Sequence, residues 1–341
     1  MRGNAVVLPG KALEPELQSR QWPAPGEQEA LIRVLACGLC GSDLFLQDGG
    51  FGDTFPVIPG HEAAGEIVAL GDDTDGFAVH DVVGLYYIDN DPSSSWSQSG
   101  RPHLGPSVVR MGVDSPGALA SFVIRPVRTL VKPRRPIPPA ELALLTDVMA
   151  TPYHALTSVA GVRPGENVLV IGVGGIGSNA VQLSALLGCR TFAIVRRQSS
   201  LDLAMELGAA AAADLAGARA MIDRGCPGGV DVVLMCADAP GLDRLALDLV
   251  TFQARIVTVA ASTAPLEIRP VDLLWREAAL LGSRGFTPQD ITAVQELYLD
   301  GRLSLRHLMR DIRPMRDYAS AFRDLRAHSG GTRILLIPDH G

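Results

Sequence analysis

Residues 37–43 read CGLCGSD, so two cysteines stand three positions apart beside a hydroxyl and a carboxylate. Thiolates at this spacing occur both in redox pairs and in zinc sites, and the spacing alone does not choose between them. Cys37 and Cys40 are therefore a redox pair, half of a structural zinc site, or one metal ligand with a bystander. Which alternative holds depends on whether other metal-binding residues occur elsewhere in the chain.

The next residues with metal chemistry are His61 and Glu62, in the segment FPVIPGHEAAGEIV. Histidine together with thiolate is typical of zinc sites, and a catalytic zinc takes three or four protein ligands while leaving one position for substrate. A single histidine is more often a surface or core residue. His61 becomes a candidate ligand only because CGSD precedes it and a glycine-rich turn follows.

That turn lies in VLVIGVGGIGSNAVQLS, between an apolar strand pattern and a helix pattern. Gly172 permits the tight turn, Gly174 lets the backbone approach a pyrophosphate, and Gly177 lets the helix pack on the strand. The helix N-terminus then offers free N–H groups to the anion. The sequence predicts a dinucleotide site formed by Gly172, Gly174, Gly175, Ile176 and Gly177.

The end of the following strand, FAIVRRQSS, indicates which dinucleotide binds. An NAD site usually places an acid there to hold the ribose 2′-hydroxyl. This chain has Arg196 and Arg197, followed by Ser199, and no acid between Cys189 and Asp202. Guanidinium groups bind phosphate oxygens well, so we expect NADP(H) to be preferred over NAD(H). The alternative is a pair of solvated arginines on a surface turn.

The pattern of elements around these motifs changes along the chain. The first 130 residues contain short β-type runs separated by glycine and proline, as in a β-rich domain. Prolines at 133–141 end this region, and an apolar helical stretch is expected from about Leu142 to Val159. From Asn167, apolar strands alternate with helices, which predicts a doubly wound parallel sheet. The expected fold class is therefore α/β with a second, β-rich domain.

Length and composition set the broad class. With 341 residues, 47% hydrophobic and 20% charged, the chain fits a globular protein of two domains. Its net charge of −7 argues against general binding to nucleic acid or anionic membrane. The start of the chain shows no signal peptide pattern. An odd, scattered set of five cysteines suggests reduced thiols and a cytoplasmic location.

Four ordered motifs, CGLCGSD, PVIPGHEAAGEIVALG, LLTDVMATPYHAL and VLVIGVGGIGSNAVQLSALLG, together resemble the zinc-containing medium-chain alcohol and polyol dehydrogenases. The resemblance covers nearly the whole chain. It implies a GroES-like catalytic domain at residues 1–150 and 288–341, and a Rossmann NADP-binding domain at residues 151–287. The active site would lie in the cleft between them. We also expect a homo-oligomer, either a dimer or a tetramer.

The same resemblance implies the site residues. Cys40, His61 and Asp147 would hold one catalytic Zn²⁺ per chain, with Glu62 as a fourth ligand or just behind; the aspartate resembles the secondary-alcohol branch. Cys37 would pack beside the strand end, because a redox pair would leave GHE and TDVM unexplained. Ser42 would take the proton of the alcohol.

Four further expectations concern other residues that the resemblance singles out. Asp43 would orient His61, as metal-bound histidines require. Phe45 occupies the place where some relatives carry a proton-accepting histidine, so the proton would leave through His154 or solvent. His80 stands where relatives commonly have glycine and is interpreted as a turn variant, not a ligand. Residues 85–120 contain no cysteine, so no second, structural zinc is expected.

The sequence thus predicts a zinc-dependent dehydrogenase that moves a hydride between a secondary alcohol or its ketone and NADP. The polar stretch 88–104 favours a polyol, cyclitol or amino-alcohol as substrate. One alternative is a zinc-free reductase of activated double bonds or quinones, and another is a non-catalytic cofactor-binding sensor.

Overall fold

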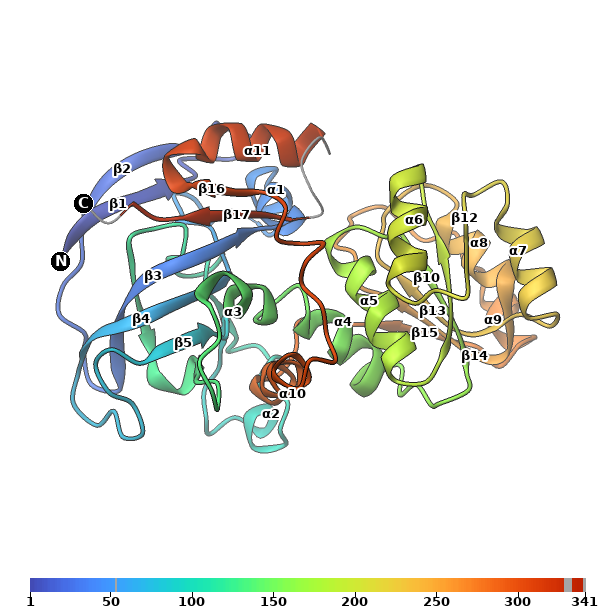
Figure 1. The fold of residues 1–341 in the computed structure, drawn as a ribbon, viewed down its shortest axis with the longest axis horizontal. Helices are drawn as coiled ribbons and strands as arrows, with labels where there is room; N and C mark the ends of the chain where they lie inside the picture. The colour runs from blue at the N-terminus through green and yellow to red at the C-terminus, as the bar shows by residue number, and fades with distance from the viewer. Residues whose placement is uncertain (53, 328–332, 340–341) are drawn as a thin grey trace. The chain divides into compact units, whose positions relative to one another are not determined.

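The computed structural model describes residues 1–52, 54–327 and 333–339, and the chain forms two compact units (Figure 1). Unit 1 comprises Met1–Asp147 and Thr287–Gly341, and unit 2 comprises Val148–Phe286. Each unit has a sheet and a core of its own.

Unit 1 is rich in β-structure, as its short β-type runs predict. Its main sheet has the order β16-β17-β3-β4-β5-β9, with β8 also paired to β3. The strands are β3 (Glu29–Leu39), β4 (Glu62–Leu70), β5 (Val82–Leu85), β8 (Phe122–Pro126), β9 (Leu130–Val131), β16 (Ile312–Pro314) and β17 (Ile334–Ile337). The long strand β3 holds the sheet together, because it pairs antiparallel with β4, β8 and β17.

Smaller elements surround this sheet. They are the antiparallel hairpin β1 (Arg2–Val7) and β2 (Glu16–Gln21), the two-stranded ribbon β6 (Ile88–Asp89) and β7 (Val109–Arg110), and the helices α1 (Gly41–Gln47), α2 (Ser95–Gln98), α3 (Pro139–Leu145), α10 (Pro288–Leu299) and α11 (Tyr318–Ala327). The core gathers apolar side chains from β3, β4, β5 and β17, including Ile32, Ile67 and Leu85, all fully buried.

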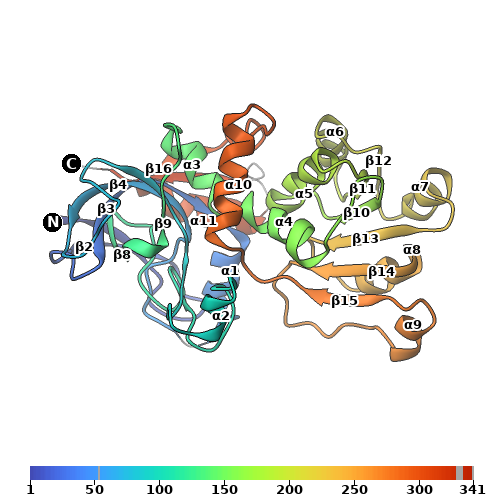
Figure 2. The same cartoon turned by 90° about the horizontal axis from the view of Figure 1, so that it is seen from below.

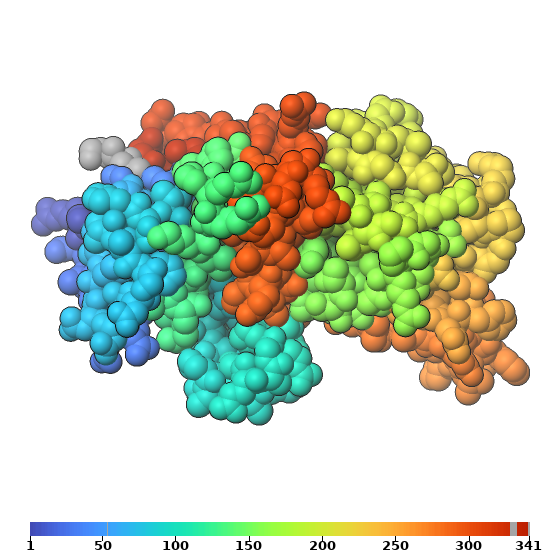
Figure 3. Space-filling model, turned by 60° about the horizontal axis from the view of Figure 1, so that its bottom comes forward, coloured from blue at the N-terminus to red at the C-terminus, as the bar shows by residue number. Residues whose placement is uncertain are grey.

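The cysteine-free segment around residues 88–110 forms a lobe on unit 1 that projects from its surface (Figure 3). Asn90 organises it: its Nδ2 donates to the carbonyls of Pro102 (3.0 Å) and Leu104 (2.7 Å), while its Oδ1 accepts from Ser107 Oγ (2.6 Å). A buried amide therefore ties this lobe together by hydrogen bonds.

The helical stretch expected from Leu142 to Val159 is not continuous. α3 ends at Leu145, α4 (Ala150–His154) begins five residues later, and a wider helical turn covers Ala155–Val159. Proline has no N–H and clashes with the carbonyl four residues back, so Pro152 is tolerated only in the first turn of a new helix. The break leaves Asp147 at the boundary between the two units.

Unit 2 is the expected doubly wound α/β fold. Its parallel sheet has the order β12-β11-β10-β13-β14-β15, which reverses direction between β10 and β13. The strands are β10 (Asn167–Ile171), β11 (Arg190–Ile194), β12 (Ala211–Ala213), β13 (Val230–Met235), β14 (Val250–Thr258) and β15 (Ala279–Gly282). Ligands of such sheets bind at the carboxyl ends of the strands, where the order reverses.

Helices cover both faces of this sheet (Figures 1 and 2). They are α5 (Gly175–Leu186), α6 (Gln198–Glu206), α7 (Ala218–Gly225), α8 (Leu242–Leu249) and α9 (Pro270–Leu274). The continuous apolar strands follow from this double cover, because residues of β10 such as Leu169 and Val170 are fully buried whichever way they point. Among the described helices of the whole chain, none has the length and apolarity needed to cross a membrane.

Candidate active site

Three sequence-predicted ligands meet in unit 1. Cys40 comes from the end of β3, His61 from the residue before β4, and Asp147 from the turn after α3. Their ligand atoms all lie within 4.8 Å of one another, and His61 Nε2 is 3.7 Å from Asp147 Oδ2. A thiolate, an imidazole and a carboxylate at this spacing form a donor set that suits zinc.

Asp43 fixes two of the three segments. It is the third residue of α1, where its Oδ2 accepts a hydrogen bond from the backbone N–H of Cys40 (2.8 Å). Its Oδ1 accepts from the backbone of Gly60 (3.2 Å) and lies 3.5 Å from His61 Nδ1. The imidazole is thereby oriented with Nε2 toward the cluster, which is the outer-shell support that a metal-bound histidine requires.

Ser42 lies in the first turn of α1, beside the cluster. Its hydroxyl oxygen is 3.1 Å from His61 Nε2. One turn further, Phe45 packs edge-on against Phe51, with ring centroids 4.9 Å apart. The position of the histidine found in some relatives is therefore part of an aromatic pair, and Ser42 is the hydroxyl that the described structure brings to the ligands.

Arg333 is a site residue that the sequence analysis missed. Its guanidinium is 4% exposed and donates to both carboxyl oxygens of Glu62, with Nε–Oε1 at 3.1 Å. The same Nη2 also donates to Asp147 Oδ2 (3.1 Å). Arg333 precedes β17, which pairs with the end of β3, so the sheet carries a positive charge behind the ligand cluster.

These neighbours shift the acidity of the cluster. Burial raises the pKa of the Cys40 thiol, but the Arg333 charge and a hydrogen bond from His61 outweigh it and lower that pKa to about 7. Burial lowers the pKa of His61, but Asp43, Cys40 and Asp147 together raise it well above its ordinary value. The thiol is thus prepared to ionise, as a metal ligand must.

Glu62 and Cys37 occupy different positions from the three candidate ligands. The Glu62 carboxylate is fully buried against Arg333, and burial raises its pKa to about 8 although the Arg333 charge opposes the shift. Cys37 is a fully buried residue of β3 whose Sγ donates to the carbonyl of Gly38 (3.6 Å). Burial raises the pKa of Cys37 well above its ordinary value, so this thiol stays protonated.

The glycine-rich turn lies at the carboxyl end of β10, where the sheet order reverses. Gly172 has φ +93°, a left-handed conformation that favours glycine. A Cβ on Gly177 would lie 1.7 Å from the carbonyl oxygen of Gly172, so only glycine fits there. Gly174 caps α5, and Gly175 and Ile176 are the first helical residues, with their N–H groups at the helix start.

The remaining predicted residues, the two arginines and two histidines, come from separate elements of the fold. Arg196 and Arg197 follow β11 and are both exposed, with Arg197 capping α6. His154 is buried at the end of α4 in unit 2. His80 has φ +76° and its Nδ1 pairs with Glu66 Oε1 at 2.7 Å, so it occupies a left-handed turn on the surface, as expected.

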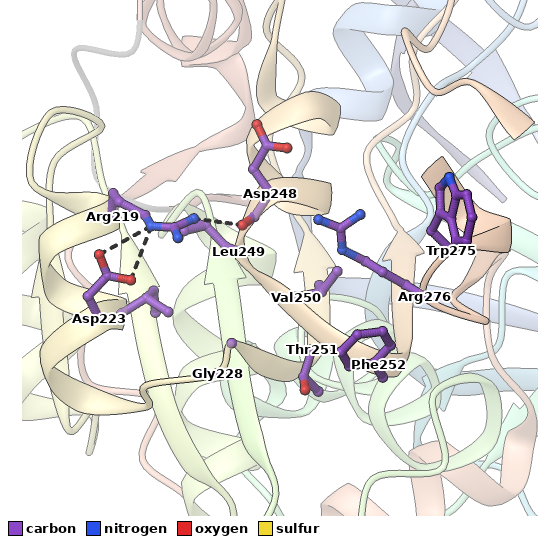
Figure 4. Close-up of a pocket in the computed structure, with 12 residues that line it drawn as sticks. Arg219, Asp223, Gly228, Asp248, Leu249, Val250, Thr251, Phe252, Trp275 and Arg276 are labelled. Atoms are coloured by element: carbon purple, nitrogen blue, oxygen red, sulfur yellow. Dashed lines mark hydrogen bonds and ion pairs between the residues drawn. The ribbon is translucent and has the colours of Figure 1, made fainter. Parts of the chain in front are cut away.

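A cavity of about 550 Å³ opens elsewhere on unit 2 (Figure 4). Aromatic and charged side chains line it, among them Arg219, Phe252, Trp275 and Arg276. It surrounds the start of β14, at the amino ends of the strands, and none of the sequence-predicted site residues lines it.

Comparisons with known proteins agree with this organisation. Residues 26–139 match the family model of the alcohol dehydrogenase GroES-like domain, and residues 175–300 match that of the zinc-binding dehydrogenases. A relative from Pseudoalteromonas atlantica, 2-dehydro-3-deoxy-L-galactonate 5-dehydrogenase, is 27% identical over 324 residues, or 92% of each chain.

Solved structures of similar proteins have the same fold. AibC, known from a crystal structure, has 28% sequence identity to this chain and a TM-score of 0.89, over 99% of this chain and 96% of the AibC chain. A zinc-binding dehydrogenase from Sinorhizobium meliloti 1021, bound to NADP, is 27% identical with a TM-score of 0.88 and covers 99% of this chain and 100% of its own. The chain therefore belongs to the zinc-type medium-chain alcohol and polyol dehydrogenases, a family of NAD(P)-dependent enzymes with a GroES-like and a Rossmann domain.

Proposed function

We propose that this enzyme is a zinc-dependent dehydrogenase that oxidises a secondary alcohol of the polyol or sugar-acid type with NADP⁺. The observation that carries the proposal is the convergence of Cys40, His61 and Asp147 within 4.8 Å, with the Ser42 hydroxyl 3.1 Å from His61 Nε2. The polyol type is supported by the relative from P. atlantica, whose name describes a sugar-acid dehydrogenase.

Cys40, His61 and Asp147 would hold one zinc ion per chain, with Glu62 as the candidate fourth ligand. A zinc ion bound there would act as a Lewis acid and lower the pKa of the substrate hydroxyl. Cys40 is suited to its task because Arg333 and His61 lower the pKa of its thiol to about 7. Cys37, buried and protonated, is not a ligand in this proposal.

The protein's own residues position the substrate hydroxyl and receive its proton. Asp43 orients His61 and Arg333 holds Glu62 and Asp147, so the ligand geometry is set before substrate arrives. Ser42 would relay the alcohol proton: its Oγ, which lies 3.1 Å from His61 Nε2, would take that proton and pass its own hydroxyl proton on to solvent. Proton transfer of this kind contributes about 10²–10⁴-fold to the rate.

Unit 2 would bind NADP(H). The pyrophosphate would lie at the start of α5, where the first N–H groups of the helix are available. A Cβ at Gly174 would meet no protein atom within 4 Å, so there is open space beside this residue for the ligand. Arg196, which is exposed after β11, would pair with the 2′-phosphate together with Arg197. The NADP-bound relative from S. meliloti supports this choice of cofactor.

The test is reduction of NADP⁺ and of NAD⁺ by zinc-replete enzyme across a panel of polyols, cyclitols, amino-alcohols and sugar acids. We expect turnover with a higher kcat/KM for NADP⁺, and a loss of about 10²-fold or more in kcat for Ser42→Ala at unchanged zinc content. Arg196→Asp should weaken NADP⁺ and improve NAD⁺. Reduction of activated double bonds by metal-free enzyme, or cofactor binding without turnover of any alcohol, would contradict the proposal.

A further inference from the structure

Arg110 belongs to a ribbon that is bonded to a neighbour of the ligand cluster. It lies in β7, opposite Ile88 of β6, and the following residue, Met111, donates its backbone N–H to the carbonyl of Tyr87 at 2.7 Å. The Tyr87 ring packs edge-on against the His61 imidazole, with centroids 5.5 Å apart. The ribbon that carries Arg110 is therefore attached to the residue that touches the metal-ligand histidine.

The Arg110 guanidinium is fixed in place on two sides. Its Nε and Nη2 donate to the two carboxyl oxygens of Asp114, at 2.7 Å and 2.9 Å. Its plane lies over the Phe51 ring, 4.9 Å from the centroid, and Phe51 is packed edge-on against Phe45 of α1. An arginine that makes a bidentate ion pair and also stacks on an aromatic ring has lost most of its rotamer freedom before any ligand binds.

One edge of this fixed guanidinium is unused by the described part of the protein. Nη1 makes no hydrogen bond to any described residue, although the side chain as a whole is only 21% exposed. Asp114 takes one N–H of Nε and one of Nη2, so three of the five N–H donors of the guanidinium are left. The site offers donors, and a partner for it has to bring acceptor oxygens.

We propose that Arg110 is a specificity-determining residue that binds the carboxylate of a hydroxy-acid substrate through the Nη1 edge of its guanidinium. This inference rests on the proposed function, because the alcohol carbon of that substrate would react beside Ser42. A hydroxyl group is also an acceptor, but a carboxylate adds a full negative charge and two oxygens that match the planar N–H donors of a guanidinium. The partly enclosed, preorganised arginine therefore favours an acid over the neutral polyol of the same length.

The experiment compares aldonates of five and six carbons with the alditols of the same chain length. Oxidation by the zinc-replete enzyme gives kcat and KM, and calorimetry gives the affinity of each aldonate for the enzyme with oxidised cofactor. We expect the wild-type enzyme to prefer the aldonate, and Arg110→Gln to raise the aldonate KM and Kd by about 10- to 100-fold. The alditol constants and kcat should change less than about threefold, since the reacting group is untouched.

A matched control is available in Arg128, which makes the same two-pronged pair with Asp89 (2.8 Å for each bond) but lies over no aromatic ring in the described part of the chain. Arg128→Gln should leave the aldonate preference unchanged. Equal losses for aldonate and alditol in Arg110→Gln, an unchanged aldonate preference, or no aldonate binding to the wild-type enzyme would overturn the assignment. Arg110-dependent aldonate binding without oxidation of any alcohol would instead refute the proposed function and leave only the carboxylate-binding role of Arg110 standing.

Discussion

Arg333→Met should destabilise unit 1 far more than an ordinary loss of a salt bridge. The Arg333 guanidinium is the cation shared by Glu62 and Asp147, and the three side chains are only 4%, 0% and 9% exposed. Removing one partner of a buried ion pair costs about 3–5 kcal/mol, because the carboxylates left behind either stay charged without compensation or have to take up a proton. Unit 1 has about 200 residues, so the melting temperature should fall by about 6–20 °C.

The assay is thermal and urea unfolding of chelator-treated protein, so that no bound cation replaces the missing charge. Arg134→Met is the matched control, because Arg134 also bridges two carboxylates, Glu296 and Asp300, but at the surface, with 48% of its side chain exposed. Exposed pairs contribute about 0–1 kcal/mol. Equal losses in the two variants would refute the idea that Arg333 compensates buried charge behind the ligand cluster.

Two other predictions concern stability away from the ligands. Burial, with help from Arg310, lowers the pKa of His307 from 6.5 to about 4, so the unfolded chain binds the proton more readily between those values. The free energy of unfolding should therefore fall as pH falls, by about 2 kcal/mol between pH 7 and pH 5. In urea titrations, the free energy of unfolding of His307→Gln should fall by about 2 kcal/mol less over the same pH range. Equal pH dependence of the wild-type protein and the variant would contradict this. Gly177→Ala should destabilise unit 2 by about 1–3 kcal/mol because its Cβ would meet the Gly172 carbonyl. Gly174→Ala meets nothing within 4 Å and should melt normally while binding NADP⁺ more weakly; the reverse order of melting temperatures would refute this account of the turn.

Much of the fold was predictable because its signals are local. Continuous apolar strands alternating with helices from Asn167 onward indicate a doubly covered parallel sheet, and β10 to β15 form such a sheet. The turn at Gly172 and Gly177 was equally readable, since a left-handed φ and a 1.7 Å clash leave glycine as the residue that fits. The ligand set required more than local signals: it came from a family resemblance, and the structure brings Cys40, His61 and Asp147 together.

What the sequence did not reveal depends on contacts between distant segments. Arg333 is 271 residues from Glu62 and belongs to no motif, so its role appears only once β17 pairs with β3. The single available signal was an arginine at the head of the apolar run RILLIP. The break after α3 was also missed, because an apolar run does not show where Pro152 forces a new helix to begin.

Metal content of the purified enzyme tests the central claim most directly. Elemental analysis should give about one zinc per chain, because three ligand types suited to tetrahedral zinc converge at one place in the described structure. The ratio should fall toward zero in Cys40→Ala and stay near one in Cys37→Ala, whose Sγ faces the Gly38 carbonyl. A ratio near zero or two in the wild-type enzyme, or loss of metal in the Cys37 variant alone, would contradict the account.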